Sequence, residues 1–336
     1  MAEVDHRGSS HGPEISGLCG GRRPRIGLAL GGGAAFGGMH VGVIAGLHEA
    51  GIEADVVAGT SAGAFVGAFY AGGTSPEEMI ERAVRLRWAE LRRHLLPMRA
   101  LMSNDRMATW LRRNLPVVDF DAMPKPFAVV TTDILCGSMV VLASEQHNAV
   151  MQMRALGVRT ADKVRHPAST AETLSDGLAS RVVWDTAPVP LAVAASSAIP
   201  VIFEPVRVGE RLLVDGGVAT MVPGSVARWL GADVVIGVDI LPPKQVFTAP
   251  RTIVEYAIQA HRISAQWAVR NRSIHAEVVL RPRAANGRWN DMRQMQELVE
   301  TGRAEAAAAM PEIRRRIAQA ARRCPVADLV AAGAGG

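Results

Sequence analysis

Cysteine is scarce in this 336-residue sequence, which holds only Cys19, Cys136 and Cys324. An odd number of distant cysteines, without CxxC spacing or a histidine at a metal-ligand interval, excludes a disulfide-stapled fold and argues against a zinc site. No apolar run reaches the roughly 18 residues needed to span a bilayer. These absences predict a globular protein of a reducing compartment, with no metal site and no membrane-spanning segment.

The first 24 residues lack the apolar core of about 7–15 residues that a secretory signal requires. They are instead polar and rich in glycine. We therefore expect residues 1–24 to form a disordered N-terminal tail and the protein to be cytoplasmic.

Lysine is nearly absent, because three lysines accompany thirty-four arginines in a chain of net charge +5. Such a chain can bind nucleic acid or an anionic membrane surface. Nine arginines lie within residues 81–115, mixed with Leu and Trp at roughly helical intervals. This pattern predicts a basic amphipathic helical segment: a surface helix with a solvated face is the commoner case, and a helix that contacts membrane transiently is the alternative. No nucleic-acid partner is expected, because no nucleic-acid-reading motif accompanies the arginines.

Short apolar runs alternate with glycine turns and helical patterns from residue 25 onward. The pattern predicts strands at residues 26–30, 55–58, 127–132, 139–143, 211–215 and 234–240, and helices at residues 38–50, 62–71 and 225–231. Strands that alternate with helices form a mostly parallel sheet covered on both faces. The expected fold is therefore α/β, as a single three-layer α/β/α domain with a mostly parallel central sheet.

Two segments lie outside this alternation. Residues 145–185 are polar and weakly patterned, and a long loop inside a compact domain is usually functional, so we predict a lid-like insertion there. The sequence after residue 303 is alanine-rich and predicts a helix, and residues 333–336 are expected to be disordered. The main domain is therefore placed at residues 25–310, and a C-terminal helix and tail at residues 311–336.

The sharpest local motif is GxSxG at residues 59–63, between a predicted strand and a predicted helix. A serine on a tight strand-to-helix turn exposes its hydroxyl at the helix N-terminus, where free N–H groups and the helix dipole help to stabilise an oxyanion. The flanking glycines, Gly59 and Gly63, permit a strained backbone. A plain turn is the alternative, but the context favours Ser61 as a nucleophile.

A second glycine turn, at residues 31–33, also follows a strand and precedes a helix. Such a turn can bind a dinucleotide, but the acidic residue expected about twenty positions later is missing because the serine turn occupies that place. The other interpretation is an oxyanion hole, because the ends of neighbouring strands bring the two turns together.

The serine needs a base. The histidines that follow residue 215 are His261 and His275, and neither is presented by a glycine loop. Asp215 ends a predicted strand on a glycine turn, which makes it the better candidate, although a carboxylate of ordinary pKa must lie within about 2.6–3.2 Å of the hydroxyl to act as a base. A lone Asp-Gly-Gly is otherwise typical of a simple turn.

Four separated segments together resemble the patatin-like phospholipases, a family of Ser-Asp acyl hydrolases. They are residues 30–37 (LGGGAAFG), 59–63 (GTSAG), 195–205 (ASSAIPVIFEP) and 215–217 (DGG). The similarity extends from about residue 26 to residue 240 and so covers most of the chain.

The resemblance implies a role for each motif. Ser61 would attack an ester carbonyl, Asp215 would take and return its proton, and the oxyanion hole would be built from Gly32, Gly33 and Ala34. The resemblance implies that six further glycines support the motifs: Gly31, Gly37, Gly59, Gly63, Gly216 and Gly217. It also implies a patatin-like fold without metal, cofactor or catalytic histidine.

Two positions depart from the family pattern. Phe36 stands where the family commonly has a basic residue, which changes the charge near the oxyanion loop. Thr220 and Met221 stand where the family often has asparagine, and this change can loosen the turn that carries Asp215.

The function implied is a lipid esterase of phospholipase A type that cleaves acyl esters through an acyl-enzyme intermediate. Three alternatives remain: an acyltransferase or a thioesterase on the same two residues, and a catalytically weak lipid-binding or regulatory protein that retains the fold. The expected partner is an acyl-ester lipid, with transient membrane contact through residues 81–115. The sequence makes no prediction of oligomeric state.

Overall fold

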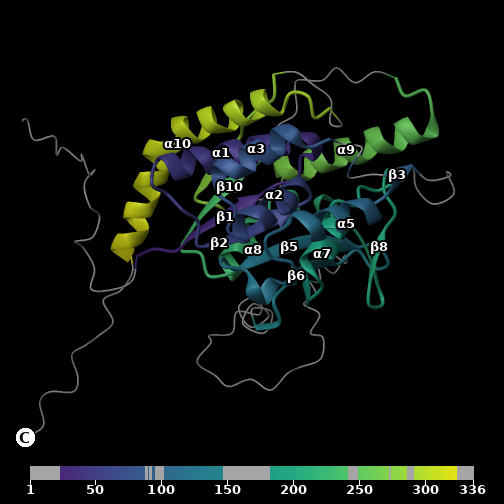
Figure 1. Ribbon diagram of the computed structural model, residues 1–336, viewed down its shortest axis with the longest axis horizontal. Coiled ribbons are helices and arrows are strands. Elements are labelled where there is room, and N and C mark those ends of the chain that lie inside the picture. The colour runs from purple at the N-terminus through teal and green to yellow at the C-terminus, as the bar shows by residue number, and fades with distance from the viewer. Residues whose placement is uncertain are drawn as a thin grey trace, which may run out of the picture.

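A mostly parallel sheet with helices on both faces forms the centre of the protein (Figure 1). The structure is a computed structural model that describes residues 23–87, 90, 93–94, 102–146, 182–240, 249–271, 274–285 and 291–323. The α/β fold expected from the alternating strands and helices is confirmed. Residues 1–22 of the predicted tail and most of the predicted lid at residues 145–185 lie outside the described residues. The predicted boundary at residue 24 is too late by two residues, because Arg23 binds Asp55.

The parallel part of the sheet has the spatial order β11 (Val278–Leu280), β10 (Val234–Val238), β1 (Ile26–Leu30), β2 (Val56–Thr60) and β5 (Phe127–Asp133). Antiparallel to β5 lies β6 (Met139–Ala143), which pairs in parallel with β7 (Val182–Asp185). The end of β5 also pairs with β9 (Arg211–Asp215), and β9 forms a hairpin with β8 (Val206–Val208). The central strands are buried along their whole length, as is typical of strands covered on both faces.

Alternate residues of the strands belong to two separate cores, because successive side chains point to opposite faces of a sheet. Leu28 and Leu30 pack with α1 (Gly38–Glu49), α2 (Ala62–Ala71) and α10 (Met295–Arg323). Ala29 and Ala58 pack on the other face against α8 (Gly224–Trp229). The helices at the carboxyl ends of β1 and β2 thus share one face, which keeps the turns that precede them close together.

The remaining helices surround this framework. They are α3 (Pro76–Arg85), α5 (Asp105–Asn114), α7 (Val189–Ser196) and α9 (Ile253–Asn271), together with the short 3-10 helices η1 (Ala34–Gly37), η2 (Phe120–Ala122) and η3 (Gly216–Val218). Strands β3 (Arg93–His94) and β4 (Met102–Ser103) pair antiparallel in a small separate sheet. Among the helices that the structure describes, none combines the length and the apolar character needed to cross a bilayer.

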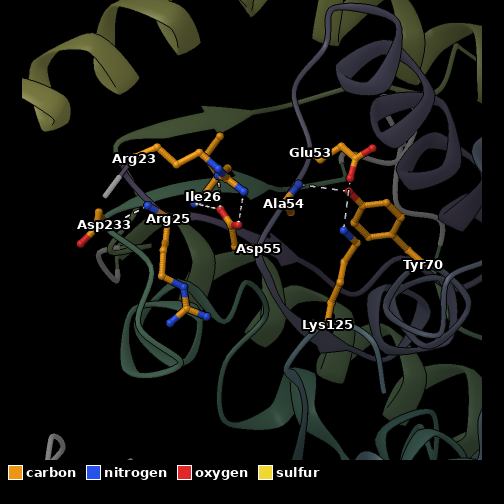
Figure 2. A network of polar contacts seen from close by, with 9 residues as sticks. All are labelled: Arg23, Arg25, Ile26, Glu53, Ala54, Asp55, Tyr70, Lys125 and Asp233. Atoms are coloured by element: carbon orange, nitrogen blue, oxygen red, sulfur yellow. Dashed lines mark hydrogen bonds and ion pairs between the residues drawn. The ribbon is translucent and has the colours of Figure 1, made fainter. Parts of the chain in front are cut away.

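The opposite, amino ends of the strands are joined by a polar network (Figure 2). The carboxylate of Asp55, just before β2, accepts hydrogen bonds from the backbone N–H of Ile26 at 2.7 Å and from the guanidinium of Arg23 at 2.6 and 2.8 Å. Asp233, just before β10, accepts from the N–H of Arg25 at 2.7 Å. These contacts fix β1 between its two neighbours at the end of the sheet that lies away from the glycine turns.

Helices α1 and α10 lie side by side along one face (Figure 1) and approach closely through glycine. Gly38, Gly42 and Gly46 recur every four residues on α1, and a side chain at Gly42 would overlap the carbonyl oxygen of Val299. Gly302 on α10 has the same relation to the carbonyl of Met39. Glycine is needed here because the two helix backbones touch, although glycine weakens an isolated helix.

Three predictions about segments need correction. Residues 81–115 are not one amphipathic helix: α3 ends at Arg85, strands β3 and β4 follow, and α5 begins at Asp105. Leu86, Met107 and Leu111 are buried, whereas Val84 is 37% exposed, so most of the helical spacing reflects core packing.

The other two corrections concern boundaries. The end of the predicted lid, residues 182–185, is strand β7, because its Val and Trp side chains complete the sheet edge beside β6. The division predicted at residue 310 falls inside α10, which begins at Met295 and buries Ile313 in the same core as the strands.

We expect Gly42→Ala to destabilise the fold, because the new methyl group meets backbone atoms of α10 that cannot move independently. The free energy of unfolding should fall by about 2 kcal/mol or more, despite the gain of up to about 1 kcal/mol in helix propensity. Gly46→Ala is the matched control on the same helix face, since its methyl group would lie 2.9 Å from the side chain of Ala306. Urea unfolding should show the larger loss for Gly42→Ala; equal stability of both variants would contradict the proposed close approach.

Candidate active site

Ser61 occupies the tight turn between β2 and α2. Its backbone has φ 53° and ψ −119°, a strained conformation for a residue with a side chain. The turn requires the glycines on both sides: a side chain at Gly63 would overlap the carbonyl group of Leu30, and one at Gly59 would lie 2.6 Å from the backbone of Ala64. The predicted strand-turn-helix context of the GxSxG motif is thereby confirmed, and the turn presses against the end of β1.

A second serine holds the backbone of this turn. The N–H of Ser61 donates to the hydroxyl of Ser196 at 2.8 Å, and that hydroxyl donates to the carbonyl of Val130 on β5 at 2.6 Å. Ser196 is completely buried at the end of α7. Sequence reasoning quoted this residue within the ASSAIPVIFEP block but assigned it no role, because its partners are 135 and 66 positions away.

Asp215 lies beside Ser61. It ends β9, where pairing with β5 brings it opposite Thr131, and only 4% of its surface is exposed. The side chain of Ser61 lies close enough to this carboxylate to lower the pKa of Asp215, and the N–H of Gly217 donates to Oδ1 at 2.7 Å. The structure therefore brings together the two residues that the sequence singled out, although 154 positions separate them.

The environment makes Asp215 an unusually strong base for a carboxylate. Burial raises the pKa of Asp215 to about 6, against the opposing effect of the hydrogen bonds from Ser61 and Gly217. A higher pKa reduces the mismatch between carboxylate and alcohol. The position of Asp215 beside Ser61 and the pKa of Asp215, which burial raises, thus both favour proton transfer from the hydroxyl to this carboxylate.

The glycine turn after β1 lies next to Ser61, but its N–H groups are not all free. The N–H of Gly31 donates to the carbonyl of Val238 at 3.0 Å, and that of Gly32 donates to the carbonyl of Met221 at 3.1 Å. The assignment of Gly32 to the oxyanion hole is therefore wrong for this conformation, because its donor is already used. Within the described residues, the N–H groups of Gly33 and Ala34 have no acceptor, and Ala34 lines the same cleft as Ser61.

His40 holds this turn from behind. Its Nε2 lies 2.7 Å from the carbonyl oxygen of Gly31, and because a carbonyl only accepts, we assign the proton to Nε2. The ring is completely buried, and burial lowers the pKa of His40 to about 4, against a smaller opposing effect of the bond to Gly31. His40 is thus neutral at physiological pH and fixes the turn. His40 lies only nine positions after Gly31 in the sequence, but that spacing did not indicate a hydrogen bond between the two residues.

The two departures from the family pattern have clear places. Met221 packs against both glycine turns, since its sulfur lies 2.6 Å from the position that a side chain at Gly32 would take and its methyl group 3.1 Å from that at Gly217. The expected loosening is therefore not observed; Met221 joins the turns instead. Phe36 is buried in the core and does not line the cleft.

An apolar cleft extends from Ser61 along α2. It encloses about 870 Å³ of empty space, counted out to its open mouth and including open solvent. Ala62, Phe65 and Phe69 form its wall on α2, and Trp110 of α5 lies 5.7 Å from the ring of Phe65 and 6.0 Å from that of Phe69. Such a lining suits a flexible apolar chain whose polar end reaches Ser61.

One cation borders this apolar space. The guanidinium of Arg82 lies 5.8 Å from the ring of Phe69 and is paired with Glu78 at 2.6 Å.

In the described residues, no group of three or more His, Cys, Asp or Glu side chains could hold a metal ion.

Several known proteins are similar to this chain. The family model described as patatin-like phospholipase matches residues 28–228, more than half of the chain. An uncharacterized NTE family protein of Mycobacterium tuberculosis is 28% identical over 221 residues, which are 65% of this chain and 49% of that protein.

One further relative is much longer than this chain, and one solved structure resembles it at lower sequence identity. The patatin-like phospholipase domain-containing protein 6 of Homo sapiens is 28% identical over 223 residues, 64% of this chain but 13% of the human protein. The crystal structure of VipD from Legionella pneumophila aligns with 88% of this chain and 67% of that chain, at 13% identity and a TM-score of 0.44. The chain spans about half the length of the mycobacterial relatives that it matches.

We expect Asp215→Asn to stabilise the folded protein above pH 6. An acid whose pKa is raised on folding binds more protons in the folded than in the unfolded state between its ordinary pKa and about pH 6, so stability falls as the pH rises through that window. The full effect is on the order of 3 kcal/mol. Asparagine keeps the amide acceptor for Gly217 but carries no charge to desolvate.

The measurement is the free energy of unfolding at pH 4 and pH 8. The gap between variant and wild type should be small at pH 4 and larger at pH 8, and Asp121→Asn, at an exposed position, controls for the loss of one negative charge. A gap that does not grow with pH would show that Asp215 is not desolvated as the structure indicates.

Proposed function

The chain belongs to the patatin-like phospholipase family, and on this basis we propose that it is a serine acyl hydrolase of phospholipase A type that cleaves acyl esters of lipids. Family membership supports lipid acyl hydrolase activity in general. The observation that carries the finer proposal is the proximity of the Ser61 side chain, which lines an apolar cleft, to the buried carboxylate of Asp215.

In the first half of the reaction, the Ser61 oxygen attacks the ester carbonyl carbon and its proton passes to Asp215. The carbonyl oxygen becomes an oxyanion, for which the N–H groups of Gly33 and Ala34 are the unused donors beside Ser61. The bond to the alcohol then breaks, and the departing alkoxide takes the proton from Asp215. The products of this half are an acyl-Ser61 ester and a free alcohol or lysolipid.

In the second half, water attacks the acyl carbonyl carbon while Asp215 accepts a proton from that water. The second tetrahedral intermediate breaks down when the Ser61 oxygen leaves and regains the proton held by Asp215. A fatty acid is released and both side chains return to their initial states. The acyl chain lies throughout in the cleft lined by Phe65, Phe69 and Trp110, where it is removed from water.

Ser61→Ala should lower kcat/KM for a short p-nitrophenyl ester at least about a thousandfold, because no covalent intermediate can form. Asp215→Asn should lower it about a hundredfold or more, since the general base is lost. Ser103→Ala is the control: Ser103 is equally buried but does not line the cleft. A fluorophosphonate should label wild type and Ser103→Ala but not Ser61→Ala.

Hydrolysis by Ser61→Ala at the rate of wild type would reject the proposed nucleophile. Folded wild type that neither hydrolyses esters nor takes the label would favour the lipid-binding alternative. Products analysed with an added alcohol separate hydrolase from acyltransferase, because a transferase gives a new ester in place of the fatty acid.

The pH profile offers an independent check on the base. Asp215 must be ionised to accept the proton, so kcat/KM should fall about tenfold per pH unit below pH 6 and reach a plateau above it. Rates are measured with an uncharged ester, and circular dichroism at each pH confirms that the protein stays folded. A profile that stays flat down to pH 4 would exclude Asp215 with its raised pKa as the base.

A further inference from the structure

Helix α9 turns an apolar face to the solvent. Thr252 caps its start, since the hydroxyl accepts a hydrogen bond from the N–H of Glu255 at 3.1 Å. Ile253 is 88% exposed, Tyr256 67% and Ile263 37%, and Ala260 between them is exposed as well. The spacing of three, four and three residues places these side chains on one side of the helix. Apolar side chains grouped this way on a surface mark an interaction site.

The opposite side of α9 lies against the wall of the candidate active site. Ile258, about half a turn from the exposed side chains, packs against the cluster of Ala198, Ile202 and Phe203. Phe203 and its neighbour Ile199 line the cleft that contains Ser61. The exposed face of α9 is therefore separated from the cleft by the thickness of one helix.

The charge of α9 indicates the kind of partner. Residues 249–271, which comprise α9 and the four residues before it, contain three arginines and one glutamate. This segment therefore carries a charge of +2 in a chain of net charge +5. A second copy of the helix would bring like charges together, whereas an anionic lipid surface complements them. Apolar side chains including an aromatic, on a helix with net positive charge, are the features of a helix that lies in the membrane interface.

We propose that the face formed by Ile253, Tyr256, Ala260 and Ile263 docks the protein on an anionic lipid surface, so that the cleft receives its acyl ester from that surface. The inference rests on the proposed function for the fate of the lipid, but the docking itself does not require catalysis. It assigns membrane contact to α9 in place of residues 81–115, where Val84 is the one large apolar side chain that is exposed among those the structure describes.

The experiment measures sedimentation of the full chain with vesicles of equal parts phosphatidylglycerol and phosphatidylcholine, and with vesicles of phosphatidylcholine alone. Wild type should bind the anionic vesicles more tightly, and added salt should weaken this binding. The double variant Ile253→Gln, Tyr256→Gln should bind at least about tenfold more weakly, because two exposed apolar side chains no longer leave water.

The matched control makes the same change at another exposed apolar pair. Ile134 and Leu135, in the turn between β5 and β6, are 50% and 66% exposed. The double variant Ile134→Gln, Leu135→Gln should bind within about twofold of wild type. Hydrolysis of a short soluble ester should be unchanged in both variants, whereas hydrolysis of vesicle lipid should fall only in the α9 variant.

Several results would overturn the proposal. They are absence of binding to anionic vesicles, equal binding by the α9 variant and wild type, and an equal loss in both double variants. A wild-type dimer that the α9 variant converts to monomer, without vesicle binding, would assign the face to a second copy of the chain. Because binding is measured without turnover, a protein that docks through α9 but hydrolyses nothing would reject the proposed function and keep the docking.

Discussion

The close approach of the serine turn to the end of β1 is the constraint on which the candidate site depends. A side chain at Gly63 would overlap the carbonyl of Leu30, so the first turn of α2 can reach β1 only with glycine at that position. The same approach places Ser61 beside the glycine turn at residues 31–33, where the unused N–H groups lie. With a larger residue at position 63, Ser61 and these N–H groups would separate, and no rearrangement of side chains could restore the distance.

A buried carboxylate is the second requirement, and it opposes stability. Asp215 loses its hydration at the end of β9 and recovers only part of the loss from Ser61 and Gly217. The rest of the fold must hold it in place, through the pairing of β9 with β5 and the hydrogen bond from its N–H to Ala198. A carboxylate that is unfavourable when charged and yet held beside a residue of the cleft, here Ser61, is typical of functional sites.

Buried hydrogen bonds that lie behind the cleft hold the three turns of the site in register. Ser196 links Ser61 to β5, Met221 links the turn after Asp215 to Gly32, and His40 holds Gly31. None of these groups lines the cleft, so in the proposed reaction each is a positioning residue. The cleft and α9 lie on the other side of the same turns, which connects the place where chemistry is proposed with the surface where lipid is proposed to arrive.

The sequence by itself determined six strands of the main sheet, the GxSxG turn and the candidacy of Asp215, because apolar periodicity and glycine turns are local signals. It missed the short strands β7, β8 and β11. It could not show that Gly32 donates its N–H to Met221, that Ser196 and His40 hold the turns, or that Leu86, Met107 and Leu111 are buried. Those outcomes depend on partners up to 189 positions away along the chain, as in the bond from Gly32 to Met221. Only the tertiary structure decides these contacts, because the packing of the sheet determines which acceptor lies within reach of each N–H group.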